Sequence, residues 1–149
     1  MNGEMRQAME IVAVRILEDA AFLFVDRMPD GNKPDRDWPP AGAELRWAGP
    51  SRGLMRVWMD PDFLKVLAAN MLGIEEDDEA AAKAGSDAMR EVLNMVVGNS
   101  LTEAWGPGPV FHLEIPESAD PDLLLPDMSE GFWIDADGHP VLFWCGNLP

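Results

Sequence analysis

Apolar residues recur at helical spacing most regularly between Glu79 and Trp105, so this stretch is predicted to be a long amphipathic helix. With 3.6 residues per turn, the apolar side chains fall on one face that is wide enough to be buried. This face comprises Met89, Val92, Leu93, Val96, Val97, Ser100 and Ala104. The pattern predicts that one side of the helix forms part of the core.

The opposite side of the same helix carries Asp87, Glu91, Asn94, Gly98 and Thr102. Because Glu91 and Asn94 are three residues apart, a carboxylate and a carboxamide are neighbours on the helix surface. A glycine within a helix costs roughly 0.5–1 kcal/mol relative to alanine, and the missing side chain of Gly98 leaves room for another surface to approach. We therefore expect a docking face. The alternative is an ordinary solvated face, on which Glu91 aids solubility and Asn94 bonds to water.

Two further helices are indicated by spacing and by end signals. Residues 4–17 place apolar side chains at helical spacing, which predicts an amphipathic helix. Residues 61–72 are predicted to form a second helix. Asp60 is suited to cap it, Pro61 is suited to its first position, and Gly73 is suited to end it.

Strands are predicted where apolar and polar residues alternate, or where a short apolar run is bounded by turn residues. They are residues 20–25, the two halves of a hairpin at 43–59, residues 110–115, and the two arms of a hairpin at 132–136 and 141–145. Alternation along 110–115 places Phe111, Leu113 and Ile115 inward. Residues 27–42 and 116–128, rich in proline and charge, are predicted to be loops. The order α-βββ-αα-βββ predicts an α+β domain with helices packed on a mostly antiparallel, six-stranded sheet.

Length and charge narrow the possible functions. The chain has 149 residues, 47% of them hydrophobic, so residues 1–149 are expected to form a single domain with one core. Its 27 acidic and 11 basic residues give a net charge of −16, which repels both nucleic acid and anionic membrane surfaces. The sequence has no apolar run that could span a membrane and does not begin like a signal peptide, so a cytoplasmic protein is expected.

The sequence offers little metal or nucleophile chemistry. Cys145 is the one cysteine and has apolar neighbours, so it is expected to be buried and inert. His112 and His139 are the only histidines, and neither has a partner at zinc-ligand spacing. Residues 135–138 resemble the start of a calcium loop but lack its later ligands, which favours a hairpin turn. An enzyme with this sequence must therefore work with very few groups.

The spacing Asp87-x3-Glu91-x2-Asn94 resembles the signature of the CheC/CheX family of chemotaxis phosphatases, and the likeness is closest to CheX. The resemblance extends over residues 52–116, and Pro116 falls within one residue of the proline in the family pattern. CheC-like relatives carry a second Glu-x2-Asn on an earlier helix. This chain lacks that second motif, so one site per chain is expected, as in CheX-like proteins.

The resemblance implies dephosphorylation of a CheY-type response regulator, whose phosphoryl group is on an aspartate beside a bound magnesium ion. Asn94 would enter the regulator's active site and orient the attacking water, while Glu91 would engage a lysine there. Asp87, Gly98 and Thr102 would support this contact. No cofactor or metal of the protein's own is expected, because the regulator holds Mg²⁺ and phosphoryl transfer depends mainly on positioning and electrostatics. CheX-like proteins pair through strand edges, so a homodimer is also expected.

Two other functions are weighed against the phosphatase. The first is a non-catalytic protein-interaction module of the same fold, because flagellar-switch relatives share the architecture without the Glu and Asn. The second is a protein that binds a small ligand, which the absence of a polar cluster or a phosphate-binding loop disfavours. The presence of both Glu91 and Asn94 favours the phosphatase.

Overall fold

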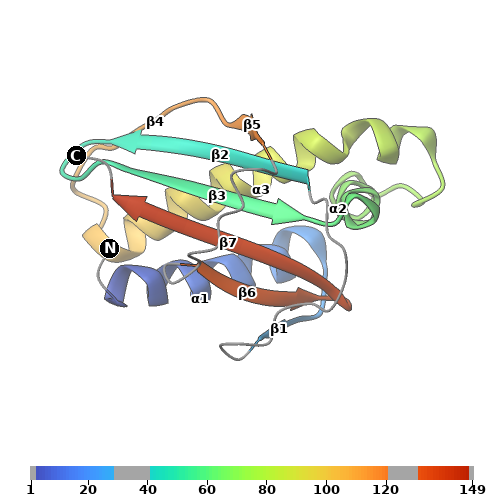
Figure 1. Ribbon diagram of the computed structural model, residues 1–149, viewed down its shortest axis with the longest axis horizontal. Helices are drawn as coiled ribbons and strands as arrows, with labels where there is room; N and C mark the ends of the chain where they lie inside the picture. Colours follow the sequence, from blue (N-terminus) through green and yellow to red (C-terminus); the bar gives the residue numbers. More distant parts are fainter. Residues whose placement is uncertain (1–2, 29–40, 121–130, 148–149) are drawn as a thin grey trace.

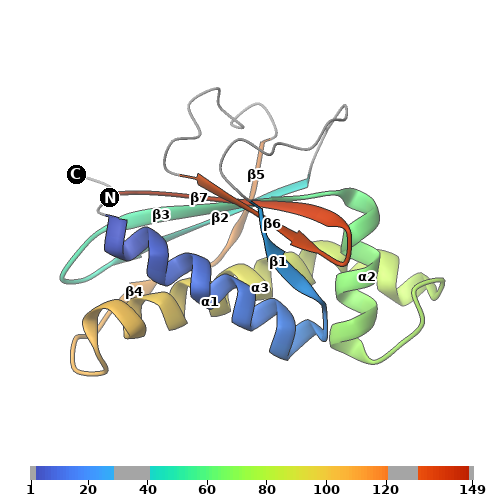
Figure 2. The same ribbon diagram turned by 90° about the horizontal axis from the view of Figure 1, so that it is seen from below.

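The helices of the described chain all lie on one face of an antiparallel sheet (Figures 1 and 2). The computed structural model describes residues 3–28, 41–120 and 131–147. The helices are α1 (Gly3–Ala21), α2 (Pro61–Leu72) and α3 (Glu79–Trp105). The strands are β1 (Val25–Arg27), β2 (Ala41–Ala48), β3 (Gly53–Met59), β4 (His112–Leu113), β5 (Glu117–Ala119), β6 (Gly131–Ala136) and β7 (His139–Asn147). This architecture confirms the predicted α+β class.

The sheet has seven strands within the described residues, one more than the six predicted. Its order is β1-β6-β7-β3-β2-β4, with β5 also paired to β2, and every pairing is antiparallel. Both predicted hairpins are confirmed, as β2–β3 and β6–β7. The extra strand arises because the chain after α3 returns along β2 and pairs with it twice.

The predicted loops are only partly described. The prediction for residues 116–128 is wrong at β5, where Glu117–Ala119 pairs with Glu44–Gly42 of β2. The ends of the other predicted loop, residues 27–42, belong to β1 and β2. Residues 29–40 and 121–130 lie outside the described part of the chain, so neither loop prediction is tested there.

The strand predicted at residues 110–115 is reduced to the two residues of β4, and its register with β2 shifts immediately afterwards. Leu113 pairs with Trp47, and the Glu114 N–H donates to the Arg46 carbonyl over 2.9 Å, so an unbroken register would place Glu117 opposite Ala43. Glu117 pairs instead with Glu44, so one extra residue lies between Glu114 and Glu117. This is a β-bulge, and Pro116, which has no N–H to donate, is suited to it.

One prediction about burial in this segment is wrong. Phe111 and Leu113 are half-buried and pack against the core, as their alternation predicts. Ile115, in the bulge between Glu114 and Glu117, is 86% exposed, so the prediction that it is turned into the core is wrong.

Near the N-terminus, α1 is longer than predicted, and the strand predicted at residues 20–25 is wrong. The helix continues through Ala21, whose carbonyl accepts a hydrogen bond of 2.8 Å from Nδ2 of Asn70 in α2. Phe22 then adopts a left-handed backbone conformation with φ 55°, and the next strand, β1, begins only at Val25. A short apolar run does not by itself distinguish a strand from the end of a helix, and here the last turn of α1 is held by the hydrogen bond from Asn70.

The ends of α2 and α3 follow from local capping. At α2, the Asp60 carboxylate accepts a hydrogen bond of 3.0 Å from the Asp62 N–H, and Gly73 ends the helix with φ 69°. At α3, the Asp78 carboxylate accepts a hydrogen bond of 2.9 Å from the Ala80 N–H. Both helices therefore span the residues that the sequence predicts.

The core lies between the helices and the sheet. Six of the seven residues predicted for the buried face of α3 are buried, namely Met89, Val92, Leu93, Val96, Val97 and Ser100. Ala104 is exposed, so its prediction is wrong, and Leu101 is buried instead. The C-terminal end of α3 diverges from the sheet in Figure 2, which leaves its last turn in solvent. Cys145 is buried in β7, as predicted.

Candidate functional site

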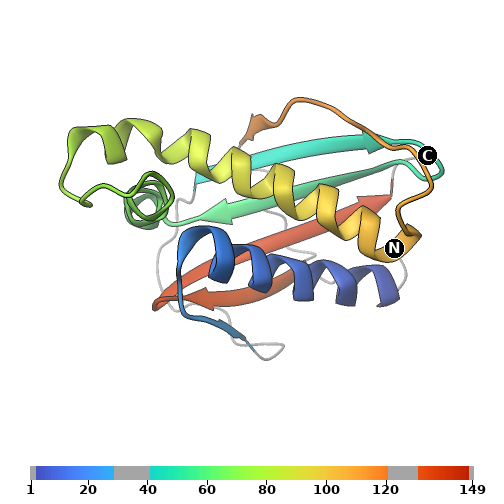
Figure 3. The same cartoon turned by 180° about the vertical axis from the view of Figure 1, so that it is seen from behind.

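The side chains of Glu91 and Asn94 lie on the side of α3 that does not form the core. Glu91 is exposed and Asn94 is half-buried, while Val92 and Leu93 between them are fully buried. Figure 3 shows α3 crossing the sheet between α1 and the β4–β5 segment. The buried face of α3 packs against α1, α2 and the sheet, so the helix that presents Glu91 and Asn94 is firmly held. A carboxylate and a carboxamide are therefore displayed on a rigid support.

Within the described residues, the side chains of Glu91 and Asn94 make no hydrogen bond or ion pair. Nearby polar groups on α3 do have partners. Asp87 pairs with Arg90 over 2.9 Å, and Thr102 Oγ1 donates to the Gly98 carbonyl over 3.1 Å. The donors and acceptors of Glu91 and Asn94 are thus available to a group from outside the protein.

Asp87 and Thr102, two of the three further predicted contact residues, are exposed, and the side chain of each bonds to another residue of α3. The Asp87 side chain is 82% exposed, so its ion pair with Arg90 is easily exchanged for another partner. The spacing of Asp87 and Arg90 in the sequence is the signal for this pair, because residues three apart are neighbours on a helix. Asp87 and Thr102 extend the polar face at either end of Glu91 and Asn94.

Gly98 borders the same face, and the protein's own packing does not require a glycine there. A Cβ atom placed on Gly98 would lie 3.8 Å from Cδ2 of Leu113, an ordinary van der Waals distance. By contrast, a Cβ on Gly85, where α3 crosses α2, would come within 2.8 Å of Leu64 Cβ. Gly85 is therefore needed for helix packing, whereas Gly98 leaves open surface beside Leu113.

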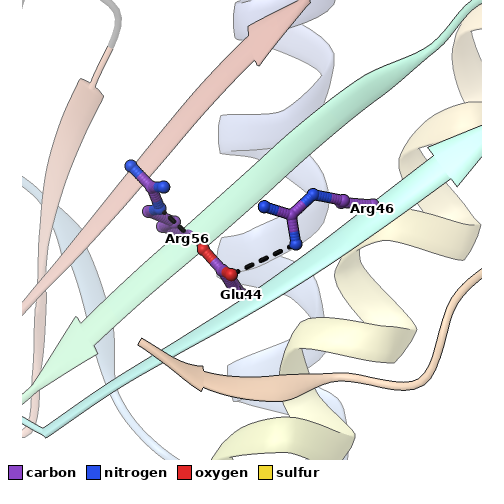
Figure 4. Close-up of polar contacts among 3 residues, drawn as sticks. All are labelled: Glu44, Arg46 and Arg56. Atoms are coloured by element: carbon purple, nitrogen blue, oxygen red, sulfur yellow. Dashed lines mark hydrogen bonds and ion pairs between the residues drawn. The ribbon is translucent and has the colours of Figure 1, made fainter. Parts of the chain in front are cut away.

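Apart from the polar face of α3, a cluster of charged side chains lies on the sheet face away from the helices (Figure 4). Glu44 on β2 accepts hydrogen bonds from Arg46 Nη1 over 3.2 Å and from Arg56 Nε over 2.9 Å. The Arg56 guanidinium also lies 5.3 Å from the ring centroid of Trp144. Because each of these groups has a partner, the cluster is best explained as a structural network that stabilises neighbouring strands.

Two kinds of site are not found in the described part of the chain. It contains no group of three or more His, Cys, Asp or Glu side chains placed to hold a metal ion. None of its helices combines the length and the apolar character needed to cross a membrane. Glu91 and Asn94 on α3 remain the best-defined candidate site.

Comparisons with a family sequence model and with solved structures both find likeness to CheX-type chemotaxis proteins. The sequence model of the chemotaxis phosphatase CheX family matches residues 43–135, which include the whole of α3. A search of curated protein sequences finds no significant match. The similar solved structures include CheX-type chemotaxis proteins, and their identities of 15–19% show a shared fold.

Three of the similar structures illustrate the likeness, and each covers nearly the whole chain. The chemotaxis protein CheX from Desulfovibrio desulfuricans has a TM-score of 0.72 and 15% identity, over 97% of this chain and 99% of that one. The CheX–CheY–BeF3–Mg²⁺ complex from Borrelia burgdorferi has a TM-score of 0.67 and 19% identity, over 96% and 97%. The chemotaxis protein CheX from Vibrio vulnificus has a TM-score of 0.67 and 18% identity, over 97% and 100%.

Proposed function

Since this chain belongs to the chemotaxis phosphatase CheX family, we propose that it accelerates dephosphorylation of the phospho-aspartate of a CheY-type response regulator. Asn94 enters the regulator's active site and positions the attacking water, and Glu91 contacts the regulator. Asp87, Gly98 and Thr102 complete the contact surface on α3. The magnesium ion belongs to the regulator, and this protein contributes none of its own.

The observation that carries the proposal is the pair of unpartnered polar side chains on a well-packed helix. A carboxamide can donate to one oxygen and accept from a water at the same time, which is the requirement for orienting a nucleophile. Phosphoryl transfer depends mainly on positioning and electrostatics, so two groups suffice when the partner supplies the metal. The structural likeness to a protein solved in complex with CheY supports the choice of partner.

The direct test is to phosphorylate a purified CheY-type regulator with a small-molecule phosphodonor and follow the loss of its phosphoryl group. We expect catalytic amounts of this protein to accelerate the decay over a series of regulator concentrations. The regulator alone gives the background rate. Binding of the phosphorylated regulator without any acceleration would contradict the proposal and favour the non-catalytic interaction module.

Replacing Glu91 by alanine is expected to raise the KM for the phosphorylated regulator by about 10-fold, because a charge-assisted contact across the interface is lost. Much of the lost rate should return at high regulator concentration, because Glu91 contributes to binding of the regulator and not to the chemical step. The measurement is the initial rate of dephosphorylation against regulator concentration. Glu103→Ala is a matched control, since Glu103 is also exposed but lies roughly 18 Å further along α3. Equal effects of the two substitutions would contradict a specific role for Glu91.

The homodimer implied by the family resemblance is a further part of the proposal. The outermost strands of the described sheet, β1, β4 and β5, are only two or three residues long, and their open edges are the available places for another chain to pair. We expect size-exclusion chromatography with light scattering to give twice the mass of the chain at micromolar concentration. A monodisperse monomer would count against it.

A further inference from the structure

Ile115 is a large apolar side chain that the fold leaves in solvent. It is 86% exposed and lies at the bulge of the edge segment that pairs with β2. Its neighbours Glu114 and Glu117 are exposed and charged. A solitary exposed isoleucine is common on protein surfaces, so its location decides whether it has a role.

The location of Ile115 can be inferred from Leu113, which lies two residues earlier in the same edge segment and contacts α3. Leu113 lies next to Gly98, because a Cβ on Gly98 would be 3.8 Å from Leu113 Cδ2. In Figure 1, α3 and β2 run in the same direction, and the segment from β4 to β5 returns in the opposite direction. The chain therefore passes from the level of Gly98 toward the earlier turns of α3, where Asn94 and Glu91 lie.

The distance from Leu113 to Ile115 along the edge segment is similar to the distance from Gly98 to Asn94 along α3. From Leu113 to Ile115 an extended chain advances roughly 6.6 Å, at about 3.3 Å per residue. From Gly98 back to Asn94 a helix covers roughly 6 Å, at 1.5 Å per residue. By this estimate Ile115 lies near the level of Asn94, on the edge segment that runs from β4 to β5. Bulges are frequent next to functional sites because they change the direction of a side chain.

We propose that Ile115 is an apolar contact for the response regulator, beside Asn94, and that it sets the affinity of docking. This inference rests on the proposed function. The charge of the protein gives a physical reason, since Glu91, Glu114 and Glu117 leave this surface acidic even with Asp87 paired to Arg90, and the whole chain carries −16. An apolar contact stabilises the complex whatever the charge of the partner, and it does not act on the chemical step.

The test compares Ile115→Ala with Val110→Ala. Both residues are β-branched and apolar, and Val110 is 79% exposed, but Val110 precedes β4 and its carbonyl lies near Gly49 at the β2–β3 turn. We expect Ile115→Ala to raise the KM for the phosphorylated regulator on the order of 10-fold, with kcat unchanged. The same substitution should weaken binding of the beryllofluoride-activated regulator equally. Val110→Ala should leave both quantities unchanged, and Ile115→Val should retain most of the affinity.

The outcomes separate this inference from the proposed function. If wild type accelerates dephosphorylation and Ile115→Ala has the wild-type KM, the inference alone is overturned. If wild type binds the activated regulator without accelerating decay, the proposed function fails, and the dissociation constants of the two alanine variants still decide the role of Ile115. If Ile115→Ala changes kcat, the thermal midpoint or the oligomeric mass and leaves KM unchanged, the docking role is overturned. Failure of wild type to bind any activated regulator would overturn both.

Discussion

Asn94→Ala is expected to lower the rate of dephosphorylation at saturating regulator by on the order of 10²-fold, the scale on which one preorganised hydrogen-bonding group contributes to catalysis. The KM should change little, because Glu91 and the rest of the α3 face still bind the regulator. Stability should be unchanged or slightly higher, since the Asn94 side chain has no partner within the described residues and alanine favours a helix. The measurement is single-turnover decay of the phosphorylated regulator, with thermal unfolding in parallel.

Asn99→Ala is the matched control for this substitution. Asn99 is exposed on the same helix, about 140° around the axis from Asn94, and its amide donates to the Met95 carbonyl over 2.7 Å. It should leave the dephosphorylation rate at the wild-type value. If Asn94→Ala and Asn99→Ala both retain wild-type activity, Asn94 is only a polar surface residue and the mechanism proposed for it is wrong.

Val96→Asp is expected to prevent folding of the domain. Val96 is completely buried on the core face of α3, so the substitution would place a charge without a partner among apolar side chains. A loss of more than about 4 kcal/mol is typical of this change, which is a large part of the 5–15 kcal/mol that stabilises an average domain. Circular dichroism and the yield of soluble protein would report the loss.

Ala104→Asp is the control for Val96→Asp, because it places the same charge at an exposed position of the same helix. The structure places Ala104 in solvent, in the last turn of α3, although its spacing suggested a buried position. The only expected cost is up to about 1 kcal/mol, from a negative charge near the negative end of the helix dipole. A folded Ala104→Asp beside an unfolded Val96→Asp would agree with the structure, and equal destabilisation by both would contradict it.

The bounds of α2 and α3, and the face of α3 that carries Glu91 and Asn94, can be predicted from the sequence alone. These features depend on interactions within one segment, namely the helical period of apolar residues in both helices and the capping of α2 by Asp60 and Gly73. Once the core face of α3 is known, the direction of Glu91 and Asn94 follows from helix geometry. The hairpins β2–β3 and β6–β7 are local in the same sense, because short turns join their strands.

Other features depend on residues that are far apart in the sequence, so they are visible only in the folded chain. The end of α1 is fixed by Asn70, 49 residues away, and β5 is a strand because β2 lies beside it. The bulge between Leu113 and Glu117 is set by the pairing of that segment with β2, which no alternation of apolar residues in the segment encodes. The physical reason is that a strand is completed by hydrogen bonds to another part of the chain, whereas a helix is completed by its own residues.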